Sequence, residues 1–142
     1  MKAIWWDIRA FDGVGPIDFG TARNQVRSFL GPNFESFRKG ADALTLTDAY
    51  DELGLHFFYD TDDRLESLVA FGSCQICYKN TFLLKDRVSD VCDRLCTIGV
   101  SFRYDDGYYL YYFDTAGFVL YAPNDFVEAV TVYRKACFEE YN

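Results

Sequence analysis

The sequence predicts an α+β domain with a curved antiparallel sheet and short helices on one face. Two segments with helical spacing of apolar residues, 21–31 and 86–96, are each followed by a hairpin pattern. The strands are joined without the long crossovers that a parallel sheet requires. The 142-residue chain is therefore expected to form a single domain, residues 1–142, built from two tandem helix–strand repeats at approximately 13–78 and 79–142.

The first predicted helix has a start signal, an apolar stripe and a stop signal. The Thr21 hydroxyl can accept a hydrogen bond from an unpaired amide of the first turn. Val26, Phe29 and Leu30 recur at the spacing of one helical face. The pair Gly31–Pro32 ends the pattern, because glycine favours the C-terminal turn and proline cannot continue a helix.

The second predicted helix repeats this design with different residues. Asp86 takes the capping position, and Val88, Val91, Cys92 and Leu95 form the apolar stripe. In this comparison Val26 and Leu30 of the first helix match Val91 and Leu95 of the second.

Each helix is followed by two runs of β-branched and aromatic residues around a polar turn. The hairpin strands are predicted at 54–59, 65–71, 117–121 and 126–133. Further strands are predicted at 4–8, 74–78, 101–104 and 108–113. The Asp-Gly step in 105–107 indicates a tight turn between the last two. A helical turn is expected at 48–53 and a short helix at 134–141.

Composition and charge restrict the classes of partner. Half of the residues are hydrophobic and 19% are aromatic, which argues against a disordered chain. The net charge of −8 repels nucleic acids and anionic membranes and favours a basic partner. The sequence shows no signal peptide and no apolar run of membrane-spanning length, so a cytoplasmic location is expected.

The residues that could carry chemistry are few. His56 is the single histidine and is expected in the middle of a strand, which is an unfavourable setting for a catalytic base. Cys74 and Cys77 fall on a predicted strand, and Cys92 and Cys96 on a helix, so a four-thiolate zinc site is the less favoured alternative to packing. No catalytic residue, no metal ligand and no cofactor is predicted.

A local motif suggests a family. The segment Gly13–Gly20 leads directly into the helix that ends at Gly31, and this opening resembles that of small bacterial immunity-type proteins. The helix–hairpin unit is similar to the repeat of the β-lactamase inhibitor protein and of the SmpA-type lipoproteins, although their lipobox and cysteine framework are not found here. The resemblance implies a scaffold that presents a concave sheet to a protein partner.

The aromatic strand 108–113 is the most unusual segment. If Leu110 points into the core, Tyr109 and Tyr111 point to the opposite face, where tyrosine is a frequent binding residue. The predicted partner-binding residues are Tyr109, Tyr111, Asp105, Asp106, Asp62 and Asp63.

The sequence thus favours a non-enzymatic protein-binding domain, an immunity or inhibitor protein that occludes a basic bacterial toxin. Two alternatives stay open. One is a small-ligand-binding or enzymatic domain that uses an aromatic concavity with His56. The other is a structural protein whose aromatic sheet face forms a homodimer.

Overall fold

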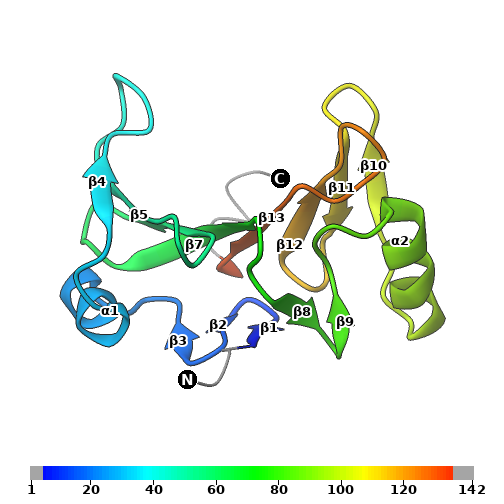
Figure 1. The fold of residues 1–142 in the computed structure, drawn as a ribbon, viewed down its shortest axis with the longest axis horizontal. Coiled ribbons are helices and arrows are strands. Elements are labelled where there is room, and N and C mark those ends of the chain that lie inside the picture. Colours follow the sequence, from blue (N-terminus) through cyan, green and yellow to red (C-terminus); the bar gives the residue numbers. More distant parts are fainter. Residues whose placement is uncertain (1–4, 136–142) are drawn as a thin grey trace.

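The computed structural model describes residues 5–135, and strands dominate this part of the chain (Figure 1). It contains thirteen strands in two sheets and two helices, α1 (Arg23–Leu30) and α2 (Val88–Thr97). The predicted α+β fold built from helix–strand repeats is therefore wrong, and the protein is predominantly β. The prediction failed because several strands are only two or three residues long, too short to show an alternating pattern in the sequence.

The larger sheet has eight strands and is antiparallel throughout. In spatial order they are β10 (Arg103–Asp105), β11 (Leu110–Phe113), β12 (Phe118–Tyr121), β13 (Ala129–Tyr133), β7 (Leu65–Phe71), β6 (Leu55–Tyr59), β5 (Thr47–Tyr50) and β4 (Glu35–Phe37). Figure 1 shows the β4 and β10 ends as two separated arms, with α1 and α2 at opposite ends of the molecule.

The smaller sheet joins the first strands of the described chain to two strands from its middle. Its strands, in order, are β3 (Ile17–Asp18), β2 (Gly13–Val14), β1 (Trp6–Arg9), β8 (Ile76–Tyr78) and β9 (Thr81–Phe82). β1 and β8 are parallel, with Trp6 opposite Ile76. The whole first half of the molecule therefore serves as the connection that a parallel pair needs.

The hydrophobic core lies between the inner face of the larger sheet, the two helices and the smaller sheet. Inner positions of neighbouring strands, such as Phe57, Leu68, Val132 and Phe118, are completely buried. Burying a side chain of this size contributes about 1.5–3 kcal/mol, so this one cluster supplies most of the driving force for folding.

The predicted helices are confirmed within about two residues at each end, but their predicted caps are wrong. Neither helix has a side-chain cap. The Thr21 hydroxyl donates to the Asp18 carbonyl at 2.7 Å, and the Asp86 carboxylate pairs with Arg94 at 2.7 Å. Neighbouring turns satisfy the first amides instead: Arg23 N–H donates to the Asp63 carbonyl.

This backbone contact recurs in the second half of the molecule. The Arg23 N–H to Asp63 carbonyl bond is 3.0 Å long, and the Val88 N–H to Asp125 carbonyl bond is 2.8 Å. The residue before each helix also forms an isolated β-bridge with the turn that precedes β7 or β13. In the first half Ala22 pairs with Arg64, and in the second half Arg87 pairs with Phe126. The two halves are thus related contact by contact, with four strands of the larger sheet and one helix in each. The single domain 1–142 and its repeat limits, approximately 13–78 and 79–142, remain a prediction.

The remaining strand predictions differ in detail. The hairpin strands are present as β6, β7, β12 and β13, and the turn at 105–107 joins β10 to β11. The helical turn predicted at 48–53 is wrong, because residues 47–50 form β5 against β6. Most of the helix predicted at 134–141 and the first residue of the strand predicted at 4–8 lie outside the described residues.

A glycine at the β5–β6 turn tests the packing between turn and sheet. Gly54 has a φ of 72°, and a Cβ at this position would collide with the Phe71 carbonyl oxygen. We expect Gly54→Ala to lower the free energy of unfolding by about 3 kcal/mol, from backbone strain plus the collision. Gly72→Ala is the matched control, because its φ is 63° but its Cβ would meet nothing within 4 Å. Urea denaturation measures both, and equal losses would contradict the packing argument.

Candidate functional site

A concavity with a volume of about 1010 Å³ lies on the outer face of the eight-stranded sheet, between the two arms. A row of residues paired across four adjacent strands forms its floor: Val69, Thr131, Val119 and Tyr112. Their strand neighbours point to the opposite face and fill the core, because side chains alternate along a strand. We call this concavity the groove.

Two cations lie over aromatic rings in the groove. The Arg103 guanidinium is 4.0 Å from the centroid of Tyr112, and its Nε is 2.6 Å from Asp114 Oδ2. Near the other arm, Lys39 Nζ is 4.5 Å from the centroid of Phe58. The groove therefore combines apolar ring surface with positive charge in two places.

Acidic groups balance these cations. Asp60 and Asp62 line the groove at the β6–β7 turn, and Arg134 Nη1 lies 3.0 Å from Asp60 Oδ2. Burial, together with the charge of Asp114, raises the pKa of Tyr133 to about 12, so its hydroxyl is neutral at physiological pH. These groups suit recognition of a polar and aromatic surface.

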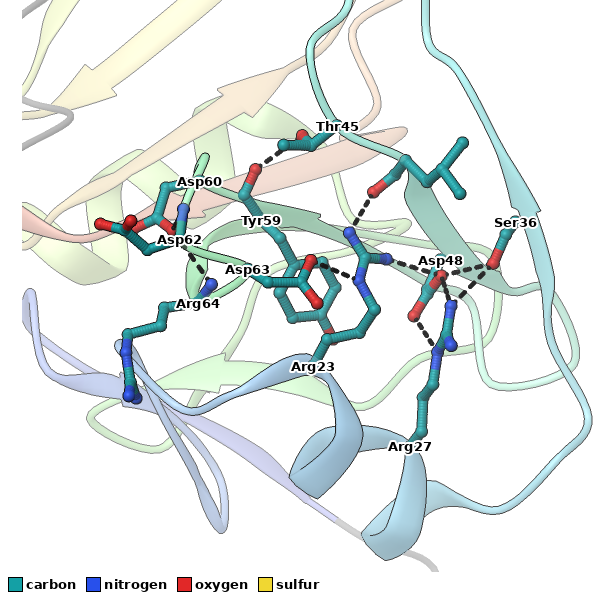
Figure 2. Close-up of polar contacts among 11 residues, drawn as sticks. Arg23, Arg27, Ser36, Thr45, Asp48, Tyr59, Asp60, Asp62, Asp63 and Arg64 are labelled. Atoms are coloured by element: carbon teal, nitrogen blue, oxygen red, sulfur yellow. Dashed lines mark hydrogen bonds and ion pairs between the residues drawn. The ribbon is translucent and has the colours of Figure 1, made fainter.

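A second feature is the buried ion network beneath α1 (Figure 2). The Asp48 carboxylate is fully buried and accepts hydrogen bonds from Arg23 Nη1 at 2.9 Å, Arg27 Nε at 2.8 Å and Ser36 Oγ at 2.6 Å. Arg23 Nε also donates to Asp63 at 2.7 Å. This network fixes α1 to β5 and to the β6–β7 turn.

The ionisation of Asp48 follows from these contacts. Burial alone would raise the pKa of this carboxyl, but the hydrogen bonds from Arg27 and Ser36 and the charge of Arg23 outweigh burial and lower the pKa. No local sequence pattern indicates this network, because its members come from positions 23, 27, 36, 48 and 63.

The structure separates the six predicted partner-binding residues. Asp62 lines the groove, whereas Asp63 is engaged with Arg23. Asp105 accepts a hydrogen bond from Gly107 N–H at 3.1 Å in the β10–β11 turn, and Asp106 is exposed beside it. Asp105 and Asp106 at the β10–β11 turn therefore do not form one continuous patch with Asp62 and Asp63 at the β6–β7 turn.

The predicted orientation of the aromatic strand is inverted. Phe113 is completely buried, and Tyr111 packs against the core and stacks on Tyr104 with centroids 4.4 Å apart. Leu110 and Tyr112 point outward and line the groove. Tyr109, the other predicted tyrosine, precedes β11 in a left-handed conformation (φ 58°) and is 47% exposed.

His56 lies on the outer face of the larger sheet but does not line the groove. Its ring contacts Phe71 and Phe37 edge-on, with centroids 4.9 and 5.9 Å away, and its Nε2 is 2.8 Å from Asp51 Oδ1. The histidine is thus part of an aromatic row at the margin of the sheet.

The cysteines in the described chain are mainly packing residues. Burial raises the pKa of Cys74, Cys77 and Cys92 to about 12, so these thiols stay protonated. The Cys77 thiol donates to Asp7 at 2.8 Å. Within residues 5–135, no three histidine, cysteine or acidic side chains gather in a way that could hold a metal ion.

Comparisons with protein-family profiles, with curated proteins and with solved structures find no match to this chain. In the described part of the chain, no helix has both the length and the apolar character needed to cross a membrane.

The ion network provides a stability test. We expect Asp48→Asn to lower the free energy of unfolding by about 3 kcal/mol or more, because it leaves two guanidinium groups without their shared buried carboxylate. The exposed Asp106→Asn variant carries the same change in charge and should stay within about 0.5 kcal/mol of the parent protein. Chemical denaturation at pH 7 compares them, and a small loss for Asp48→Asn would contradict the network's role.

The same carboxylate predicts a pH dependence. Because folding lowers the pKa of Asp48, its contribution to stability is present above the unfolded pKa near 4 and is lost as the pH falls through the folded value. The difference in stability between the parent protein and Asp48→Asn should therefore shrink between pH 6 and pH 3. Denaturation curves across this range measure it, and a constant difference would show that Asp48 is not ionised in the fold.

Proposed function

We propose that this chain is a non-enzymatic protein-binding domain that receives a basic protein partner in the groove. The observation that carries the proposal is the cross-strand floor of the groove, where Tyr112 and Phe58 present aromatic surface under stacked cations. Tyrosine and arginine are among the residues most enriched at the energetic centres of protein interfaces.

The charges of the chain support a basic partner. The net charge of −8 attracts a cationic protein over a distance and speeds encounter. Inside the groove, Asp62 offers a carboxylate on one wall, Asp60 is already paired with Arg134, and the cations Lys39 and Arg103 are held over rings or against Asp114. Specific contacts would therefore form with both apolar and positive groups of the partner.

The biological role that we propose is inhibition of a bacterial toxin by occlusion, as in immunity proteins. The resemblance of the segment Gly13–Gly31 to such proteins supports this role. Occlusion needs a rigid concave surface and no catalytic group. The continuous eight-stranded sheet beneath the groove is consistent with such a surface.

Site-specific photocrosslinking in the producing cell tests the groove. A photoreactive phenylalanine analogue at Val119, on the groove floor, should capture a basic protein, whereas the same analogue at exposed Ile98, directly after α2, should not. Equal capture at both positions would contradict the proposal. The captured protein is then identified and purified for calorimetry with this chain.

Calorimetry with the purified partner measures the contribution of the groove. Thr131→Arg places a long charged side chain on the groove floor and should weaken binding by about a hundredfold, because it blocks close packing. Thr97→Arg, at the exposed end of α2, is the matched control and should leave the affinity unchanged. An unchanged affinity for Thr131→Arg would exclude the groove as the binding surface.

The inhibitory role has its own test. Expression of the captured partner alone should arrest growth, and co-expression of this chain should restore it. The Thr131→Arg variant should fail to restore growth, while Thr97→Arg should succeed. A partner that is harmless when expressed alone would leave protein binding in place but would overturn the role as a toxin inhibitor.

A further inference from the structure

The two helices lie on the sheet with equivalent backbone contacts but opposite chemistry. In α1, Arg23 and Arg27 stand one turn apart and direct two guanidinium groups to the sheet (Figure 2). In α2, the residues at the equivalent positions are Val88 and Cys92, which are buried and uncharged. The second half therefore lacks the cations that fill the space between helix and sheet in the first half.

The positions facing these residues also correspond. In the sheet register, Asp48 of β5 lies opposite Phe57 of β6, and Tyr111 of β11 lies opposite Leu120 of β12. Tyr111 therefore occupies the position in the second half that the buried Asp48 carboxylate occupies in the first. In the turn, Asp125 corresponds to Asp63, since each carbonyl accepts the first amide of its helix. Asp63 binds a guanidinium in the first half, and no hydrogen bond or ion pair of the Asp125 carboxylate is seen within residues 5–135.

The space left between α2 and β11 is a crevice of about 450 Å³. Its walls include the rings of Tyr111 and Phe102, and carboxylates stand at Asp93 and Asp125. One cation, Arg87, also borders it, with the guanidinium 5.1 Å from the centroid of Phe126. The crevice thus combines aromatic surface with an excess of negative charge, the surroundings that a guanidinium group prefers.

We propose that this crevice binds an arginine side chain of the protein partner, which would complete the second half as Arg23 completes the first. Arg23 gives the pattern: its guanidinium lies 4.1 Å from the centroid of Tyr59 and its Nε donates to Asp63. The incoming guanidinium would donate to the Asp125 carboxylate and stack on Tyr111. The inference rests on the proposed function only in naming a protein partner as the source of the arginine.

A titration with a small probe tests the crevice directly. N-acetyl-arginine amide, added at millimolar concentration to the isotope-labelled protein, should shift the amide resonances of Ser89, Cys92 and Tyr111 in NMR spectra. Asp125→Asn should weaken this binding about tenfold, because it removes a charge-assisted hydrogen bond. Asp106→Asn, which changes the net charge equally, should not weaken it. Equal shifts with N-acetyl-lysine amide, or no shifts at the crevice, would overturn the proposal.

A second variant places the arginine within the chain itself. Val88→Arg reproduces the first-half arrangement and should abolish binding of N-acetyl-arginine amide while the spectrum outside the crevice is preserved. Binding that persists in a folded Val88→Arg variant would overturn the proposal. If that variant does not fold, the comparison between Asp125→Asn and Asp106→Asn still decides the question.

The two proposals fail in different ways. If Thr131→Arg weakens the partner complex but Asp125→Asn does not, the crevice is excluded and the groove stands. If Thr131→Arg leaves the affinity for the partner unchanged while the arginine probe still binds the crevice, the groove is excluded as the binding surface and the crevice remains an arginine site.

Discussion

The ladder between β7 and β13 is the contact on which the rest of the structure depends. Five residue pairs, from Ala129 opposite Phe71 to Tyr133 opposite Ser67, join two four-stranded halves into one sheet. The inner residues of this ladder lie in the core, and its outer residues Val69 and Thr131 form part of the groove floor. Without this ladder, β7 and β13 would each become an exposed edge strand, and the concave face would not exist.

The two halves then show that one backbone arrangement tolerates two ways of attaching a helix. α1 is held by a buried carboxylate between two arginines, which depends on exact charge pairing. α2 is held by Val88, Val91, Cys92 and Leu95, which depends on shape and apolar area. The apolar attachment leaves polar and aromatic groups at its margin available for other molecules.

The sequence predicted the elements whose signal is local. Val88, Val91, Cys92 and Leu95 mark a helical face without reference to any other segment, and the predicted hairpins have clear turns. Strands such as Gly13–Val14 and Thr81–Phe82 are too short for periodicity, so the fold class was wrong. The ion network joins residues up to 40 positions apart, and nothing local indicates which acid meets which arginine.

The aromatic strand shows a different limit. Alternation fixes which residues share a face, but a strand made of Leu, Tyr and Phe has no polar partner to show which face is outside. The packing of Phe113 on Phe118, with ring centroids 4.8 Å apart, decides the orientation. Of the predicted site, Asp62 lies in the groove and Tyr111 in the crevice beside α2, and the surrounding residues came only from the three-dimensional arrangement.

The parallel pairing of β1 with β8 has a consequence for how the chain acquires its fold. β1 can form its antiparallel contact with β2 at once, because only a few residues separate them, but its other edge must wait for a strand about 70 residues later. During synthesis that edge stays open while the first half emerges, and closing it needs a loop of high entropic cost. Folding of the smaller sheet is therefore expected to be a late step and the period of greatest exposure to strand-mediated aggregation.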